Sequence, residues 1–401
     1  MKKNNALLIL TLAVFVCGCT SPTETDTVLS IDIEEAFNNP CDIFLSDFAD
    51  EVEYVPLENT PESVTGENLY VYATDRYLVA ISFKRMQLFD RTTGRFLRKI
   101  GVLGQGPNDY LATQPVYGFD EHRQTILCEG SSNNRIVYDL EGNTIHKIFN
   151  PEGVDISKNL ISLDENSYAI YLGNYYGNDP YKLYLFDDKG NVFKKFANHH
   201  SYIPDPNSFF TMPCIFYKWK NNLFFYENCV DTLFHVTKSE LNPYYRLKLG
   251  KYNPPYSDRP RLPQPNNDPI MDKYFLFRTI NETDRFLFFS FTHGKFYRRG
   301  GYSPTYFGYH EKQTGITKVS KVDDTHRSPI INDLDDFSPL CPMGWTITPS
   351  GEMVAYLEAE DILEWFEANP EKARELPKHL KELSKLKIED NQVVVIARIK
   401  Q

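Results

Sequence analysis

Residues 88–97 read Leu-Phe-Asp-Arg-Thr-Thr-Gly-Arg-Phe-Leu, and this pattern decides the fold. An apolar strand end leads to Asp, a short turn with Gly, and a second run of alternating apolar residues. The Asp accepts backbone hydrogen bonds and the Gly adopts positive φ, as the tip of a hairpin requires. Copies follow at 137–148, at 185–193 and, more weakly, at 233–249. The marker residues are Asp90, Asp139, Asp187 and His235, with spacings of 49, 48 and 48 residues. We expect these Asp residues to be structural.

A repeat of about 48 residues with three to four short strands is typical of a β-propeller blade. A fifth copy at 306–316 arrives late because Tyr252–Asp272, with six prolines, is expected to form a long loop. Residues 45–401 then leave room for six blades. Val52–Leu57 and Val393–Ile399 are apolar strands suited to closing the ring. The prediction is an all-β, six-bladed β-propeller over 45–401.

The last blade is expected to contain a short helical insertion at about 360–386. Its apolar residues have helical spacing, interrupted by Pro370 and Pro377. We predict two short helices packed on the rim of the propeller. A helix lying on a membrane surface is the alternative, which the mixed Glu and Lys face disfavours.

Composition excludes several classes of protein. The 401 residues include 28 Phe and 26 Tyr but only 6 Met and 3 Trp, with 25 Pro, which favours strands and turns over helix bundles. Such an aromatic content is sufficient for a buried core, so a disordered chain is excluded. No apolar run reaches the roughly 18–20 residues that span a bilayer. The net charge of -11 argues against a nucleic-acid partner.

The N-terminus resembles a bacterial lipoprotein signal at 1–18. Lys2 and Lys3 precede an apolar core, Ala6–Val16, and Val-Cys-Gly-Cys at 16–19 resembles a lipobox. The resemblance implies that Cys19 carries acyl chains, which anchor the protein to a membrane. An ordinary cleaved signal peptide is the alternative. Removal of 1–18, which holds two Lys and no acidic residue, changes the net charge from -11 to -13. Residues 19–44 are expected to form the tether and lead-in.

The remaining cysteines match no zinc pattern. Cys214 and Cys229 lie where a hairpin could bring them together, and the cell envelope permits disulfides. Buried thiols are the interpretation that we favour, because reduced Cys is among the most buried residue types. Besides Cys19 the mature chain keeps five cysteines, an odd number, so at least one thiol has no internal partner.

Three segments together resemble a known family. They are Phe48–Glu58, Lys99–Tyr110 and Glu389–Ile396. The set resembles the six-bladed β-propeller lipoproteins of Bacteroidota, which are similar in architecture to NHL and TolB-type propellers. Asn108-Asp109 replaces the usual Gly-Glu, and Gln392 replaces the usual Pro. The resemblance implies the fold and a lipid anchor, but no activity.

Two loops superficially resemble ligand sites. Gly101–Gly106 is glycine-rich, but no helix opens after Pro107, so we interpret it as a crossover between blades and not as a phosphate site. The run Asn332-Asp333-Leu334-Asp335-Asp336 is a weak candidate for Ca²⁺ through Asp333, Asp335 and Asp336. It lacks the Gly and Glu of an EF-hand, and a solvated acidic loop is the alternative that we favour.

No catalytic set is evident. The nine His form no metal-binding pair, and no Gly-x-Ser-x-Gly elbow occurs. No catalytic residue and no cofactor are therefore predicted. Aromatic loops are the candidate binding residues, since exposed rings beside Asn and Asp suit glycans and peptides; the alternative is that they cap the blades. These residues are Tyr175, Tyr176, Tyr202, Tyr297, Tyr302 and Tyr306.

The sequence therefore predicts a non-catalytic binding or scaffold protein of the cell envelope, anchored in the outer membrane by lipid, with a protein partner or a glycan as ligand. Periplasmic and surface orientations both remain open. One alternative is a lyase or hydrolase acting on polysaccharide or peptide at the central channel. Another is a structural subunit of an outer-membrane complex.

Overall fold

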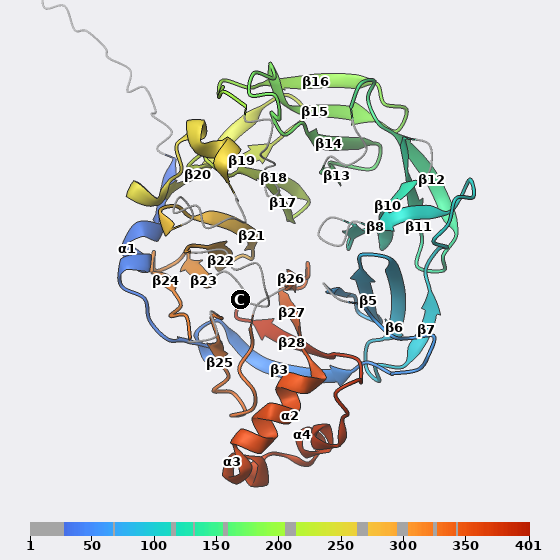
Figure 1. The fold of residues 1–401 in the computed structure, drawn as a ribbon, viewed down its shortest axis with the longest axis vertical. Coiled ribbons are helices and arrows are strands. Elements are labelled where there is room, and N and C mark those ends of the chain that lie inside the picture. The colour runs from blue at the N-terminus through green and yellow to red at the C-terminus, as the bar shows by residue number, and fades with distance from the viewer. Residues whose placement is uncertain are drawn as a thin grey trace, which may run out of the picture.

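Six β-sheets form a ring in the computed structural model, as the repeat predicts (Figure 1). The structure describes residues 28–66, 69–113, 118–130, 133–154, 159–204, 214–262, 272–294, 304–323, 327–341 and 344–401. Each sheet is one blade, and we call its strands A to D from the channel outward. The all-β, six-bladed propeller is thus confirmed.

The blades follow the order of the chain around the ring. Blade 1 holds β4 (Tyr70–Ala73), β5 (Tyr77–Ser82), β6 (Arg85–Asp90) and β7 (Phe96–Lys99). Blade 2 holds β8 (Tyr110–Thr113), β9 (Phe119–Asp120), β10 (Thr125–Gly130), β11 (Asn134–Tyr138) and β12 (Thr144–Phe149), with β8 and β9 both paired to β10. Blade 3 holds β13 (Leu160–Ser162), β14 (Ser167–Tyr171), β15 (Tyr181–Asp187) and β16 (Val192–Ala197).

The second half of the ring has the same design. Blade 4 holds β17 (Cys214–Trp219), β18 (Asn222–Glu227), β19 (Thr232–Val236) and β20 (Leu241–Lys248). Blade 5 holds β21 (Leu276–Glu282), β22 (Phe286–Thr292), β23 (Thr305–Glu311) and β24 (Thr317–Val319). Blade 6 holds β26 (Thr346–Ile347), β27 (Glu352–Leu357), β28 (Val393–Ile399) and β3 (Ala49–Pro56).

The ring closes in blade 6, where both ends of the chain share one sheet. β3 pairs antiparallel with β28, and the register places Val55 opposite Val394 and Glu53 opposite Ile396. The predicted pairing of 52–57 with 393–399 is therefore confirmed. This pairing joins the two ends of the propeller through backbone hydrogen bonds, which is how a ring of blades avoids an open seam.

Residues 29–44 form a strap along the outside of blades 4, 5 and 6. β1 (Leu29–Asp32) adds a parallel strand beyond β20, and α1 (Ile33–Asn38) follows at once. Asp32 caps this helix by accepting a 2.9 Å hydrogen bond from the backbone N–H of Glu35. β2 (Ile43–Phe44) then pairs with β25 (Ile330–Ile331). The lead-in of the sequence prediction thus packs against the blades from residue 29 onward.

The Asp residues of the repeat stabilise the turns between strands C and D. Asp90 accepts from the backbone N–H groups of Thr92 and Thr93, and Asp187 accepts from those of Lys189 and Asn191. The structural role predicted for them is confirmed. The fourth marker is displaced: His235 lies within β19, and the hydroxyl of Thr237 performs the capping role at that turn.

The helical insertion lies in the B–C connection of blade 6 and contains one more helix than predicted. α2 (Ala359–Ala368), α3 (Pro370–Glu375) and α4 (Lys378–Lys381) are followed by a 3-10 turn at Glu382–Lys385. Pro370 begins α3 and Pro377 precedes α4, so each proline starts a helix instead of only interrupting one. Further 3-10 turns lie at Leu45–Asp47, Gly250–Tyr252 and Tyr256–Arg261. Ile362, Leu380 and Leu383 are buried against the propeller, which confirms the predicted packing.

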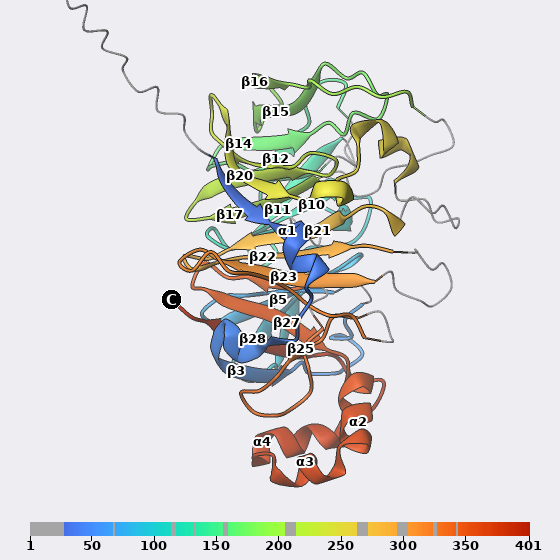
Figure 2. The ribbon, with the colours of Figure 1, turned by 90° about the vertical axis from the view of Figure 1, so that its left-hand side faces the viewer.

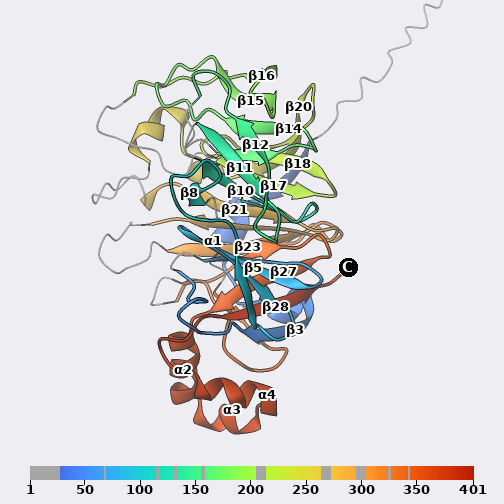
Figure 3. The ribbon, with the colours of Figure 1, turned by 90° about the vertical axis from the view of Figure 1, so that its right-hand side faces the viewer.

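The two faces of the propeller differ in their connections. The short A–B and C–D turns lie on one face, together with the C-terminus, and we call it the turn face. The B–C and D–A connections lie on the other, the loop face, together with α2, and the B–C connections of blades 3, 5 and 6 are the long ones (Figures 2 and 3). Gly101–Gly106 lies in the D–A connection between β7 and β8, as predicted.

None of the five described cysteines forms a disulfide. Cys128, Cys214 and Cys229 are buried, as the favoured interpretation predicts, whereas Cys41 and Cys341 are partly exposed. Burial raises the pKa of Cys214 and of Cys229 to about 12, so both remain protonated thiols. Among the described residues, no helix is both long and apolar enough to cross a membrane.

Candidate functional site

The central channel holds a cavity of about 830 Å³ to which all six blades contribute. The A strands end at this cavity, and it includes the A–B turns at 121–124, 220–221 and 348–351, so it opens on the turn face. The walls combine apolar and aromatic side chains with polar and charged ones. Ligand sites are typically concave and largely apolar, with a few polar groups at fixed positions. The channel is therefore the first candidate site.

A polar triangle joins three blades at the wall of the cavity. Lys218 at the end of β17 lies 3.0 Å from the carboxylate of Asp120 and donates a 2.8 Å hydrogen bond to Ser162. The hydroxyl of Ser162 donates to Asp120 at 2.6 Å. Burial opposes ionisation of Asp120, but Lys218 and Ser162 outweigh it and hold its pKa below the usual value. Asp120 and Lys218 are thus a satisfied ion pair, which makes the wall rigid.

Glu121 follows Asp120 in the A–B turn of blade 2 and behaves in the opposite way. Burial raises its pKa well above the usual value, and the adjacent charge of Asp120 adds to the shift. Within the described part of the chain its side chain has no hydrogen bond or ion pair. The pKa values of two neighbouring carboxyl groups are thus shifted in opposite directions, down for Asp120 and up for Glu121.

Arg278 contributes a positive charge from the opposite wall. It lies on β21, lines the cavity, and is exposed to the solvent of the channel. Its depth among the surrounding walls lowers the pKa of its guanidinium, and the nearby hydroxyl of Tyr70 on β4 partly opposes this effect. Among the described residues it forms no hydrogen bond and no ion pair.

The large aromatic rings of the cavity offer little open surface. Trp345 is buried, and Lys312 and Lys220 lie 4.0 and 4.9 Å from the ring centroid of Trp219. The indole N–H of Trp219 donates to Asp284 at 3.2 Å. Tyr70 is partly exposed. Recognition in the channel therefore depends more on its polar groups than on stacking.

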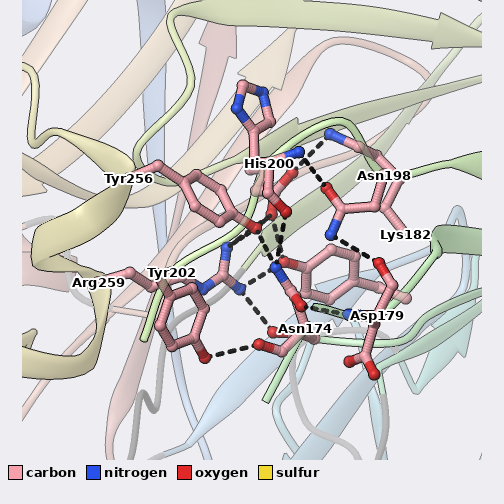
Figure 4. Close-up of polar contacts among 11 residues, drawn as sticks. Asn174, Asp179, Lys182, Asn198, His200, Tyr202, Tyr256 and Arg259 are labelled. Atoms are coloured by element: carbon pink, nitrogen blue, oxygen red, sulfur yellow. Dashed lines mark hydrogen bonds and ion pairs between the residues drawn. The ribbon is translucent and has the colours of Figure 1, made fainter. Parts of the chain in front are cut away.

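A second charged cluster lies on the loop face, where Glu227 and Arg259 are both fully buried (Figure 4). One oxygen of Glu227 accepts from Arg259 at 2.6 Å, Tyr171 at 2.7 Å and Tyr256 at 2.9 Å, and the other from Lys182 at 2.8 Å. Burial opposes ionisation, but Lys182 and Arg259 prevail and lower the pKa of Glu227 to about 2. The cluster fixes the proline-rich connection, which carries Arg259 and Tyr256, onto blades 3 and 4.

Two predicted binding loops rest on this cluster. Tyr202 donates to the backbone carbonyl of Asn174 at 2.6 Å, and its N–H donates to the carbonyl of Gly177 at 2.9 Å. Above this base Tyr176 is 77% exposed and Ile203 is 90% exposed. The loops are thus held by hydrogen bonds while they present apolar side chains to solvent. None of Tyr175, Tyr176 and Tyr202 lines the channel cavity.

The other predicted site residues have different outcomes. Tyr306 is not in a loop: it lies in β23, where its ring stacks on Phe291 with centroids 5.4 Å apart. Tyr297, Tyr302 and Cys19 lie outside the described residues. Their roles remain predictions.

The acidic loop at 332–336 uses its carboxylates within the protein. Asp333 accepts from the backbone N–H of Ser46, and Asp335 accepts from Tyr54 and Asn332. Within the described ranges, no group of three or more His, Cys, Asp or Glu side chains is arranged to hold a metal ion. Asp333 and Asp335 therefore have protein partners, and the Ca²⁺ site and the solvated acidic loop both remain predictions.

Sequence reasoning missed the charged residues of both sites. Arg278 follows Phe275-Leu276-Phe277, and Asp120-Glu121 follow a strand end, but single charges in a repeat of this length are common. Glu227 pairs with Arg259, 32 residues away, and with Lys182, 45 residues away. No local sequence pattern predicts these contacts. The one available signal was a charged residue between apolar residues of a strand, as Lys182 is in Tyr181–Asp187.

The chain belongs to a family described as a domain of unknown function, DUF4934, whose model matches residues 28–398. The fold also resembles two solved structures from Bacteroides. A Bacteroides fragilis protein, BF0058, which is described as exported, is 17% identical with a TM-score of 0.66, covering 94% of this chain and 100% of that one. A DUF4221 family member from Bacteroides vulgatus is 12% identical with a TM-score of 0.50, covering 88% and 98%. No curated protein matches the sequence.

Proposed function

We propose that this propeller is an exported, lipid-anchored protein of the cell envelope that binds a ligand in its central channel without transforming it. The observation that carries the proposal is the cavity of about 830 Å³ on the turn face, with charged groups from several blades at its wall. Its volume lies in the range of small-molecule and cofactor sites. The ligand is a glycan or a segment of an envelope protein.

The location rests on the N-terminus and on a relative. The lipobox-like sequence at 16–19 supports lipidation of Cys19, and the similar Bacteroides fragilis protein is described as exported. Metabolic labelling with an alkyne fatty acid, followed by membrane fractionation, tests this. We expect labelling of the full-length protein and its loss in Cys19→Ala. Labelling that persists in Cys19→Ala contradicts the anchor.

Binding in the channel is tested with a variant that fills it. Ile347 of β26 lines the cavity and is partly exposed, so Ile347→Trp reduces the space available to a ligand. Ile316 lies in a C–D turn away from the cavity and is 51% exposed, so Ile316→Trp is the matched control. Purified full-length protein in detergent is applied to glycan arrays and to envelope extracts from the source organism.

We expect partners of the wild-type protein to be retained by Ile316→Trp and lost by Ile347→Trp, with unchanged circular dichroism. Partners that bind all three proteins equally contradict the channel as the site. Such a result instead favours the exposed Tyr176 and Ile203 on the loop face.

An enzyme is the second candidate, and Asp120 with Glu121 is the observation that favours it. A neutral and an ionised carboxyl group side by side provide a general acid and a general base. Turnover of a polysaccharide or peptide by the wild-type protein, abolished by Glu121→Gln, establishes this function. Binding without turnover, unchanged in Glu121→Gln, supports the binding protein.

A further inference from the structure

Arg278 is the extra residue of a β-bulge in the innermost strand of blade 5. Phe277 pairs with Phe291 and Thr279 pairs with Ser290, so Arg278 has no counterpart on β22. In the A–B pairs of blades 1, 3, 4 and 6 the register is continuous over the described residues. Bulges are common beside functional sites because they redirect a side chain. Here the redirected side chain lines the cavity.

The geometry explains why a bulge is needed. Side chains of a regular strand alternate between its two faces, but the extra residue leaves Phe277 and Ile280, three positions apart, in the same hydrophobic cluster with residues of blade 4. A long charged side chain reaches the channel more readily when the alternation is broken. The bulge therefore separates Arg278 from the packing between blades and presents its guanidinium to the cavity.

The guanidinium is unsatisfied within the described part of the protein. It has five N–H donors in a planar fork, which match the oxygens of a carboxylate or phosphate in pairs. Arg259, on the other face, contacts Glu227, Tyr256, Tyr171 and the carbonyl of Gly173. Arg278 in the channel has no such contacts among the described residues. The hydroxyl of Tyr70 near it is also without a hydrogen bond in this part of the chain.

We propose that Arg278 anchors an oxyanion site in the channel, and that the ligand carries a carboxylate or phosphate group. This inference rests on the proposed function, because it names the chemistry of the ligand that the channel binds. Arg278 supplies the paired donors, and the hydroxyl of Tyr70, which also lines the cavity, is near enough to affect the pKa of Arg278. The bulge keeps the guanidinium available in the unliganded protein.

Neighbouring charges leave this site positive. Asp120 is paired with Lys218, and burial raises the pKa of Glu121, which favours its neutral form. Glu282 is also paired, since Lys312 lies 2.5 Å away. The protein as a whole carries a net charge of -11 and therefore repels anions at long range. An anion that binds here is thus selected by direct contact and not by the overall field.

The test measures anion binding by full-length protein in detergent. Titration calorimetry and thermal unfolding use three probes: D-glucuronate for a carboxylate, inorganic phosphate, and D-glucose as the neutral analogue. The variants are Arg278→Gln, Arg278→Lys and Arg374→Gln. Arg374 is a surface residue of α3, paired only with Glu371 among the described residues, so it controls for the loss of one positive charge.

We expect glucuronate, phosphate or both to raise the wild-type Tm by about 2 °C at ten times Kd, with no effect of glucose. Arg278→Gln should weaken binding roughly 10- to 100-fold, Arg278→Lys should retain part of it, and Arg374→Gln should bind as the wild type does. The stronger of the two anions identifies the group on the ligand. Equal affinity in Arg278→Gln and the wild type, or no binding of either anion, overturns the inference.

The two proposals fail separately. If a glycan or partner is lost in Ile347→Trp but binds Arg278→Gln normally, channel binding holds and the oxyanion site is wrong. If anions bind through Arg278 while no partner responds to Ile347→Trp, the oxyanion site holds and the proposed function is wrong.

Discussion

The buried cluster on the loop face and the channel both hold charged side chains, but they differ in how these are paired. Glu227 and Arg259 are fully buried and each has several partners, whereas Arg278 and Glu121 have none among the described residues. A buried charge with several hydrogen-bonding partners holds structure together, and removing one partner leaves the others uncompensated. An unsatisfied charge contributes little to the fold and is available to a ligand. We therefore expect the cluster on the loop face to contribute to stability and the charged groups of the channel to contribute to recognition.

The largest expected effect follows from Glu227→Gln. The change leaves Arg259 and Lys182 buried without a counter-charge, so we expect a loss of about 3–5 kcal/mol in the free energy of unfolding. Denaturant unfolding monitored by tryptophan fluorescence measures it. The control is Glu367→Gln, an exposed residue of α2, which should change stability by less than about 0.5 kcal/mol. A similar small effect at both positions would mean that the cluster does not hold the loop face.

The pH dependence of stability should have opposite signs at the two glutamates. The pKa of Glu227 is lowered from 4.5 to about 2, so its contribution of roughly 3 kcal/mol is complete above pH 4.5 and is lost as the pH falls toward 2. The pKa of Glu121 is raised, so above pH 4.5 ionisation favours the unfolded state and stability declines as pH rises.

Unfolding of the wild type, Glu227→Gln and Glu121→Gln between pH 2 and 8 checks both signs. Glu227→Gln should remove stability that grows with pH between 2 and 4.5. Glu121→Gln should increase stability at pH 7 relative to the wild type. Two slopes of the same sign would contradict the assigned protonation states.

An Arg→Lys exchange should affect the two regions differently. Arg259→Lys cannot maintain both arms of the guanidinium contacts, so we expect a loss of about 2 kcal/mol. Arg278→Lys removes no contact with any described residue, and the stability should stay within about 0.5 kcal/mol. Thermal unfolding of the two variants side by side makes this comparison.

A small effect on the fold is also expected for Arg278→Met. Because the guanidinium is unsatisfied, an apolar side chain of similar length should change the free energy of unfolding by less than about 1 kcal/mol. We expect the change to be an increase in stability, because no hydrogen bond is lost. A loss of several kcal/mol, as at Glu227, would show that Arg278 has a structural role in the channel.

Features that repeat along the chain could be predicted from sequence, and features that join distant positions could not. Asp90 and Asp187 recur at a fixed interval because every blade needs the same turn. The closure by β3 and β28 followed from two apolar strands at the ends of the propeller. The turn of blade 4 was displaced because Thr237 replaces Asp, and Tyr306 was assigned to a loop although it continues a strand.

The candidate site depended on single residues. The bulge at Arg278 is a mismatch between two strands, and it appears only once their register is known. The partners of Glu227 come from blade 3 and from the long connection after blade 4, so their proximity is a property of the ring. The raised pKa of Glu121 depends on burial that the turn sequence does not encode.

The strap at 29–44 gives the propeller a mechanical attachment. β1 runs parallel to β20, with Leu29 opposite Tyr245 and Asp32 opposite Lys248. A pull on the chain before Leu29, along the strand, loads these hydrogen bonds in shear, where several must break together. The helix and strands that follow carry the remaining tension to blades 5 and 6. With the lipid anchor that we propose at Cys19, a drag force on the protein is spread over half of the ring before it reaches the strand that closes it.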